Sequence, residues 1–308
     1  MNATGMTGAP GAERFAPGWL ELRESADAAA RATDLLVPLR AQLPASPGRL
    51  VVWDLGCGTG SLGRWLAGRL DVPQHWILHD RDPDLLERAR DAIPGVTTET
   101  RVGDITRLGA ADLAGAGLVV ASALLDLLTF DEVDALAEAI TGVGCPALLT
   151  LSVVGRVRLT PYDPADAEFA AAFNAHQRRE ILPSPGEVSQ TPRTNGGGRS
   201  LLGPDAVTAA TEAFERRGAA VQTSPSPWRL GPGDAALAAE WLRGWVAAAC
   251  EQRPDLPGEE YLRRRLDDCA AGRLSVVVHH RDLLAVPSCL WGRTPRPPGL
   301  RPKARGTR

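Results

Sequence analysis

Short apolar runs alternate along the first half of the chain with longer stretches in which apolar residues recur at helical spacing. A run of about four to eight apolar residues predicts a buried strand, and helical spacing predicts a helix with one buried face. The predicted strands cover residues 50–53, 76–80, 118–122 and 147–153. Helical spacing follows at residues 61–70 and 82–93, and this alternation is typical of a doubly wound α/β sheet.

The second half of the chain continues this pattern. The expected elements are helices over residues 164–179 and 203–217 and strands over residues 219–223 and 274–280. Between those two strands lie further stretches with helical spacing, at residues 234–252 and 259–271. A polar stretch rich in Pro, Ser and Gly, residues 183–200, interrupts the pattern; loops of this length are usually functional lids or disordered segments.

Residues 19–43, ahead of the first strand, predict one long helix. Its apolar face consists of Leu22, Ala26, Ala29, Ala30, Leu36 and Leu39. Arg23, Asp27 and Arg31 recur every four residues on another face, where they can form ion pairs one turn apart. This charged face is either exposed to solvent or covers a ligand.

Three glycines at alternate positions follow the first predicted strand. Gly56, Gly58 and Gly60 predict a tight turn into the next helix, where the backbone can approach a ligand and free N–H groups are available. Asp54 precedes them, and its carboxylate would repel a pyrophosphate but pair with a cationic amino group. The third glycine of the dinucleotide-binding fingerprint would fall at Ser61, so the spacing departs from that motif. Taken alone, Asp54 also fits an Asx turn.

Two further acids stand at the ends of predicted segments. Asp80 ends the second strand, about 20 residues after the glycine turn, where nucleotide-binding α/β folds place a carboxylate on the ribose. Asp82 stands before Pro83, which is typical of a helix N-terminus, so we interpret Asp82 as a helix cap. Asp104, in the segment 102–105, fits a plain turn acid equally well when taken alone.

Taken together, residues 51–60, 76–80 and 102–105 resemble the ordered motifs of the class I S-adenosylmethionine (SAM) methyltransferases, in a bacterial branch of small-molecule type. The resemblance implies a Rossmann-like, mostly parallel sheet of seven strands in the order 3-2-1-4-5-7-6, with strand 7 antiparallel and SAM as the cofactor. The cofactor contacts that it implies are Asp54, Gly56, Gly58, Gly60, Asp80, Arg81, Asp104, Ile105 and Ser122.

The same resemblance gives these residues separate roles. Asp54 and the glycines surround the methionine moiety, and Asp80 binds the ribose hydroxyls. Asp104 with Ile105 meets the adenine, and Arg81 lies along the edge of the ribose or adenine.

The family often covers its active site with an N-terminal helix. Residues 18–46 are therefore an expected lid, in which Arg23 or Arg31 would hold an anionic group of the substrate. In the minimal fold a short hairpin stands in place of residues 234–272, so we expect these helices to cap the carboxyl ends of strands 4 and 5.

Besides Arg23 and Arg31, two residues are catalytic candidates and three are candidates for substrate binding. Methyl transfer is an in-line displacement in which the reactive group belongs to the cofactor, and a general base, where used, adds about 10²–10⁴-fold. Asp126, just past the fourth strand, is the best-placed base, although it equally suits a helix start. His176 is a second candidate or a core histidine, and Tyr162 is a candidate for substrate binding. Trp241 and Trp245 either pack in the core of the helical insertion or form a wall for a flat substrate.

Charge narrows the choice of partners. The chain has a net charge of −3, and residues 292–308 carry six basic side chains without an acid, so the rest of the chain carries −9. An acidic body disfavours a nucleic-acid substrate, and we expect the Pro-rich tail, residues 291–308, to be disordered. Lys303 is the only lysine, which excludes Schiff-base chemistry from the folded body.

The sequence also bears on compartment and metal. No signal-peptide pattern and no membrane-spanning run of apolar residues occurs, so we expect a cytoplasmic protein without membrane contact. The cysteines show no paired or metal-binding spacing, so reduced thiols and no metal site are expected.

The sequence therefore predicts a methyltransferase domain over residues 47–290, flanked by a flexible segment at 1–17 and the basic tail. The leading hypothesis is in-line methyl transfer from SAM to a small molecule in a capped pocket. A methyltransferase acting on RNA or protein is the second hypothesis. The third is a SAM-binding protein of this fold without methyl transfer.

Overall fold

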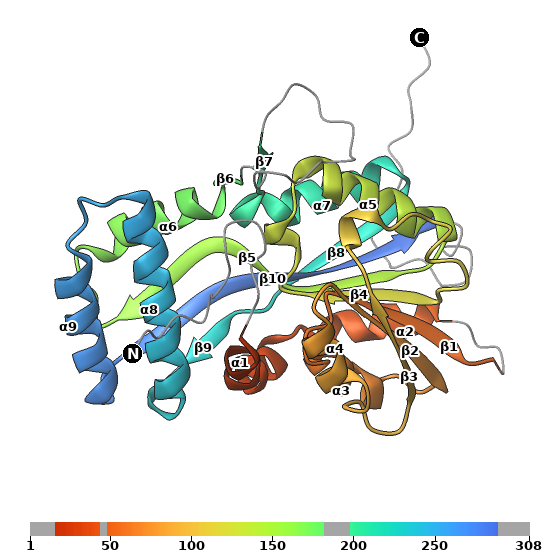
Figure 1. Cartoon of the computed structure of the whole chain (residues 1–308), viewed down its shortest axis with the longest axis horizontal. Coiled ribbons are helices and arrows are strands. Elements are labelled where there is room, and N and C mark those ends of the chain that lie inside the picture. Colours follow the sequence, from red (N-terminus) through yellow and green to blue (C-terminus); the bar gives the residue numbers. More distant parts are fainter. Residues whose placement is uncertain (1–15, 44–47, 182–197, 289–308) are drawn as a thin grey trace, which may run out of the picture.

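The computed structural model describes residues 16–43, 48–181 and 198–288. Its main sheet has the strand order β3-β2-β1-β4-β5-β10-β8, and β9 also pairs with β10 (Figure 1). The strands are β1 (Leu50–Leu55), β2 (Gln74–Asp80), β3 (Thr97–Val102), β4 (Leu118–Ser122), β5 (Ala147–Thr160), β8 (Ala219–Pro225), β9 (Trp228–Leu230) and β10 (Ser275–Pro287). The first five strands are parallel, whereas β10 is antiparallel to β5, β8 and β9. Since β8 and β10 are the sixth and seventh predicted strands, the predicted order is confirmed.

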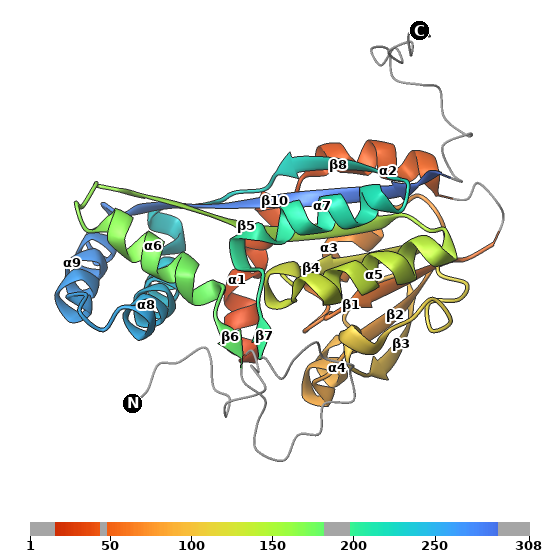
Figure 2. The ribbon, with the colours of Figure 1, turned by 90° about the horizontal axis from the view of Figure 1, so that it is seen from above.

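Helices cover both faces of the parallel sheet (Figure 2). They are α5 (Phe130–Val143) and α7 (Ala206–Arg216) on one face, and α2 (Leu36–Gln42), α3 (Ser61–Leu66) and α4 (Pro83–Ala89) on the other. Successive residues of β1 enter opposite cores, Val52 on the α3 face and Trp53 on the α5 face. Because both faces are buried, the central strands are continuous apolar runs, which is why the sequence reveals them.

Strands β5 and β10 continue beyond the parallel sheet as a long arm. β4 pairs with β5 only as far as Thr150, and the later residues of β5 pair with β10 alone. Both strands are longer than predicted. The arm is partly exposed and carries polar residues such as Arg156 and Arg158, while Arg281 and Asp282 interrupt the apolar run of β10.

Three helices pack on this arm around a core of their own. They are α6 (Asp166–Gln177), α8 (Ala235–Gln252) and α9 (Gly258–Ala270), which we call the cap. The last two are the helices predicted between the sixth and seventh strands. In both views α1 (Pro17–Ala30) lies between the cap and the parallel sheet (Figures 1 and 2).

The N-terminal segment forms two helices, so the prediction of a single helix over residues 19–43 is wrong. Helix α1 ends at Ala30, Arg31 and Ala32 are extended, and a short 3-10 turn (Thr33–Leu35) leads into α2. The reason is a tertiary hydrogen bond, because the Ala32 N–H donates to Asp282 Oδ2 on β10 at 2.8 Å. The helical spacing of residues 19–43 cannot show that the Ala32 N–H bonds to Asp282, 250 residues away in the chain, instead of to a carbonyl of the preceding turn.

A small ribbon of β6 (Glu180–Ile181) and β7 (Arg199–Ser200) stands at the two ends of residues 182–197, which lie outside the described residues. Most of the predicted polar loop, the basic tail and nearly all of the N-terminal segment 1–17 also lie outside them. Among the described helices, none combines the length and the apolar character needed to cross a membrane.

Candidate active site

The glycine turn joins β1 to α3 at the carboxyl edge of the parallel strands. Gly56, Gly58 and Gly60 have left-handed backbones, with φ of 64°, 55° and 81°, which a side chain would make costly. The neighbouring strand holds the turn in place, since the Gly56 N–H donates to the His79 carbonyl at 2.8 Å and the Gly58 N–H donates to Asp80 Oδ2 at 2.9 Å. Asp80 therefore braces the turn, whatever ligand it binds in addition.

Asp54, near the end of β1, is only 1% exposed. Neither of its carboxylate oxygens has a hydrogen-bond partner in the part of the chain that the structure describes. The alternative interpretation as an Asx-turn residue is therefore wrong. Burial raises the pKa of this carboxyl from 3.8 to about 7, and the charge of Arg31 offsets part of the rise. A buried carboxylate without donors costs stability, so this one has the properties of a ligand-binding group.

Arg31 lies at the corner between α1 and the 3-10 turn, with its side chain buried. Its Nη2 donates to Ser61 Oγ at 3.4 Å and to Ser122 Oγ at 3.3 Å, and the guanidinium lies 5.5 Å from the centre of the Trp65 ring. Its Nε and Nη1 have no hydrogen-bond partner within the described ranges. Burial lowers the pKa of this guanidinium, and the charges of Asp27, Asp282 and Asp54, in decreasing order of effect, act in the opposite direction.

Asp54 and Arg31 are thus two buried, opposite charges that affect each other's pKa without forming a hydrogen bond. Both retain unused hydrogen-bonding capacity. A molecule with an ammonium and a carboxylate on one carbon would satisfy both. The sequence predicts Arg31 for the substrate, whereas the structure places it against Ser122, a residue that the sequence predicts for the cofactor.

Helix α1 packs directly on the glycine turn. A Cβ atom on Gly58 would lie 3.2 Å from Leu20 Cδ1 of α1. The Glu24 carboxylate of α1 accepts two hydrogen bonds from Arg64 of α3, at 2.7 and 2.5 Å. The helix therefore covers the turn by both apolar contact and an ion pair.

The other end of the charged face of α1 contacts the arm. Arg23 donates to Asp27 at 2.9 Å, as the spacing predicts, and Asp27 also accepts from Trp228 Nε1 of β9 at 2.9 Å. The Arg23 guanidinium lies 5.1 Å from the centre of the Trp228 ring. This face is therefore buried against β9, so its interpretation as a solvated face is wrong.

Three further residues predicted for the cofactor, Arg81, Asp104 and Ile105, lie in turns after β2 and β3. Between Arg81 and α4, Asp82 accepts the N–H two residues further along at 3.0 Å, which confirms the prediction that it caps this helix. Asp104 accepts the N–H of Thr106 at 2.9 Å in a partly exposed turn, so the turn-acid interpretation holds in this structure. Arg81 is exposed and Ile105 is half-buried beside these turns.

Of the predicted catalytic residues, the structure brings Asp126 to the carboxyl edge of the sheet. It lies in a 3-10 turn (Leu125–Leu127) just after β4, and it is half-buried. His176 is instead buried between α6 and α8, where its Nε2 lies 3.0 Å from Glu251 Oε2. It therefore behaves as the core histidine that the sequence offered as the alternative.

The three remaining substrate candidates are not brought to the glycine turn. Tyr162 is 75% exposed just beyond the outer end of β5, roughly 30–40 Å from Thr150 at about 3.3 Å per residue. Trp241 and Trp245 stack with ring centres 5.2 Å apart, and Trp245 is buried against Phe169 in the core of the cap. Both tryptophans pack within the cap, as the alternative interpretation expects.

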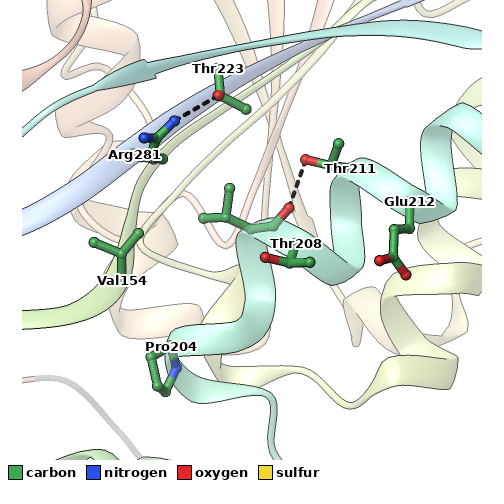
Figure 3. A pocket seen from close by; sticks show the side chains of 8 residues that line it. Val154, Pro204, Thr208, Thr211, Glu212, Thr223 and Arg281 are labelled. Carbon is green, nitrogen blue, oxygen red and sulfur yellow. Dashed lines mark hydrogen bonds between the residues drawn. The ribbon is translucent and has the colours of Figure 1, made fainter.

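An open groove of about 530 Å³ lies between α7 and strands β5, β8 and β10 (Figure 3). Its lining residues are Val154, Pro204, Val207, Thr208, Thr211, Glu212, Thr223 and Arg281. Arg281 donates to Thr223 Oγ1 at 3.0 Å, and Thr211 donates to the Val207 carbonyl at 2.8 Å. None of the residues predicted for the site lines this groove, so we do not assign it to the reaction.

Two residues that shape the site are not predicted from the sequence. Ser61 marks only a helix start by pattern, yet its hydroxyl accepts from Arg31. Asp282 holds the corner at Ala32 from β10. Its one sequence signal is an acid within a run that is otherwise mostly apolar.

Residues 52–146 match a protein family described as a methyltransferase domain. The matched segment contains the glycine turn, Asp80, Asp104 and Ser122. A sequence search of curated proteins finds no match to the chain.

The chain is also similar to solved structures at low identity. The cyclopropane synthase MmaA2 of Mycobacterium tuberculosis gives a TM-score of 0.42 and 15% identity over 82% of this chain and 83% of that chain. The mycolic acid cyclopropane synthase CmaA1, complexed with S-adenosylhomocysteine (SAH) and CTAB, gives 0.41 and 15% over 81% and 83%. A geranyl diphosphate methyltransferase in complex with SAM gives 0.37 and 13% over 82% and 84%.

The family match and the site agree on the cofactor. The matched segment carries the three left-handed glycines and the buried Asp54, whose unpartnered oxygens suit an ammonium group. Residues 52–146 are therefore the cofactor-binding domain of a class I SAM-dependent methyltransferase, with SAM as its cofactor.

Proposed function

We propose that this methyltransferase acts on a small molecule, held beside the glycine turn beneath α1. The observation that carries the proposal is the cover that α1 forms over the turn, through Leu20 and the Glu24–Arg64 ion pair. An active site enclosed by the protein's own helices suits an acceptor that fits beneath them. The net charge of −9 outside the basic tail also disfavours a nucleic-acid polymer.

At the cofactor end, we assign Asp54 to the ammonium and Arg31 to the carboxylate of the methionyl group. Each of the two is buried and has unpartnered polar atoms among the described residues. Two opposite charges on either side of one amino-acid group fix its orientation, and orientation is the main contribution that a protein makes to an in-line displacement. The predicted contacts of Asp80 with the ribose and of Asp104, Ile105 and Arg81 with the nucleoside complete this assignment.

The bound cofactor supplies an electrophilic methyl group, so the protein's remaining tasks are to align the acceptor and exclude water. Helix α1 would exclude water by closing over the turn. Asp126, beyond the end of β4, is the residue that we propose to accept a proton from an acceptor that carries one.

Transfer of a labelled methyl group from SAM to fractions of a bacterial extract tests this proposal. We expect the label in small molecules that pass an ultrafiltration membrane. Retained label that ribonuclease or protease releases would show a macromolecular substrate instead. Binding of SAM without transfer to any fraction would favour a SAM-binding protein of this fold, and thermal stabilisation by NAD but by neither SAM nor SAH would refute the cofactor assignment.

The glycine turn gives a separate prediction. In Gly58→Ala, the left-handed backbone costs about 1–2 kcal/mol, and the new Cβ would also press on Leu20 at 3.2 Å. Gly115 has a φ of 84°, and no atom lies within 4 Å of the place that a Cβ would take there, so Gly115→Ala is a matched control for backbone strain. We expect both variants to lower the free energy of unfolding in urea, but only Gly58→Ala to weaken SAH binding. Equal SAH affinity in the two variants would contradict close approach of the ligand to the turn.

A further inference from the structure

Asp282 is a fully buried carboxylate on β10 with no role in the chemistry described above. Its two oxygens accept backbone N–H groups from distant parts of the chain, Ala32 at 2.8 Å and Leu151 at 2.7 Å. Both donors lie where regular structure is interrupted. Ala32 follows the end of α1, and Leu151 has a left-handed φ of 57° within β5.

These two backbone positions flank the Arg31 side chain. Ala32 is the next residue after Arg31. Leu151 follows Thr150, which pairs with Ser122, and Ser122 Oγ accepts a hydrogen bond from Arg31. Asp282 therefore fastens the backbone that carries the guanidinium to the strand beside one of its hydroxyl partners.

The Arg31 side chain needs such an anchor. Its bonds to Ser61 and Ser122 are long, at 3.4 and 3.3 Å, and a long arginine side chain has much rotamer freedom to lose. Its place is therefore set largely by where its backbone is held. The left-handed backbone of Leu151 is strained, and its hydrogen bond to Asp282 helps to offset that strain.

We propose that Asp282 is a positioning residue, which preorganises Arg31 to receive the carboxylate of the cofactor's methionyl group. The inference rests on the proposed assignment of Arg31. Asp282 acts through the Ala32 backbone and does not itself contact the cofactor.

The negative charge of Asp282, considered without its hydrogen bonds, would weaken the binding of a carboxylate at Arg31. Asp282 and Arg31 are close enough to shift each other's pKa, although burial is the main cause for both groups. The negative charge of Asp282 would also repel a carboxylate bound at Arg31. Neutralising Asp282 should therefore strengthen binding if only electrostatics mattered, so a loss of affinity reports a loss of position.

Asp282→Asn tests the proposal, because the amide keeps one acceptor oxygen and turns an NH₂ group toward one of the two backbone donors. Calorimetry would compare SAH with 5′-methylthioadenosine, which has the same nucleoside but no amino-acid end. We expect SAH to bind roughly tenfold more weakly, the size of one buried hydrogen bond. We expect the affinity for 5′-methylthioadenosine to change less than about twofold. Asp166→Asn in the cap, where the carboxylate binds Tyr261 and Arg265, should lower stability without changing the ratio of the two affinities.

Equal losses for both ligands, or no loss for either, would overturn the proposal. Wild-type protein that binds neither ligand would overturn the proposed function instead, so the two failures are distinguishable. Hydrogen exchange on the wild-type protein gives a second test that does not depend on the variant folding. The Ala32 amide should exchange as slowly as that of Leu151 before any ligand is added; fast exchange that SAH slows would mean that the ligand orders the corner, contrary to the proposal.

Discussion

Asp54→Asn should make the free protein more stable at pH 8 and, in the same molecule, remove tight binding of SAH. Burial raises the pKa of the Asp54 carboxyl from 3.8 to about 7. At pH 8 the folded protein therefore holds an ionised carboxylate that has no hydrogen-bond donor among the described residues. Asparagine has the same shape without the charge, so it relieves this cost but gives up the pairing with an ammonium group.

The size of the stability gain follows from the pKa. A carboxyl whose folded pKa is raised loses its contribution to stability as the pH rises from its unfolded value, 3.8, through its folded value, about 7. At 1.36 kcal/mol per pKa unit this amounts to about 4 kcal/mol above pH 7. The amide of the variant is itself buried without hydrogen-bond partners, which costs about 1–3 kcal/mol. The free energy of unfolding should therefore rise by about 1–3 kcal/mol in total.

Urea unfolding from pH 5 to pH 8 measures the stability effect. The advantage of Asp54→Asn over wild type should grow as the pH rises to about 7 and then stay level. Calorimetry of SAH near pH 7 should show proton release in the wild type, because the ammonium favours the ionised carboxylate, and none in the variant. A stability difference that does not vary with pH, or undiminished SAH binding by the variant, would contradict the role assigned to Asp54.

The fold could be predicted from the sequence wherever local pattern and tertiary environment agree. Central strands such as β4 are buried on both faces, so their apolar runs are visible without a structure. In the arm the local pattern does not reveal the strands, because one side of it is partly exposed and polar. Both of its strands are therefore longer than the sequence predicts. The break after Ala30 is determined by Asp282 from the far end of the chain, which no local pattern contains.

The candidate site is predictable to a similar extent. Asp54 and the glycines follow from the order of strand, acid and turn, because the chemistry lies within a few consecutive residues. The sequence assigns Arg31 to the substrate because nothing in it shows that the side chain reaches Ser61 and Ser122. Trp245 could not be assigned from the sequence for a different reason, because a large aromatic residue has the same spacing whether it faces a cleft or a core.

Arg31→Met should distinguish the cofactor assignment of Arg31 from the substrate role that the sequence predicts. Methionine fills a similar volume beside Trp65 but offers no donor to a carboxylate. Losing the charge-assisted hydrogen bonds should cost about 2–3 kcal/mol, or about 100-fold in SAH affinity. The affinity for 5′-methylthioadenosine, which has no carboxylate, should stay nearly constant, and calorimetry of both ligands measures the difference.

Arg23→Met is the matched control, because Arg23 is an arginine two turns earlier, within α1, that hydrogen-bonds Asp27 and stacks on Trp228 instead of contacting Ser61 and Ser122. Its SAH affinity should equal that of the wild type. If Arg31 held the acceptor instead, Arg31→Met would keep its SAH affinity and raise only the KM for the methyl acceptor. If Arg31 only supported the fold, SAH and 5′-methylthioadenosine would weaken together. A loss of SAH affinity with an unchanged affinity for 5′-methylthioadenosine is the result expected if the carboxylate of the methionyl group binds at Arg31.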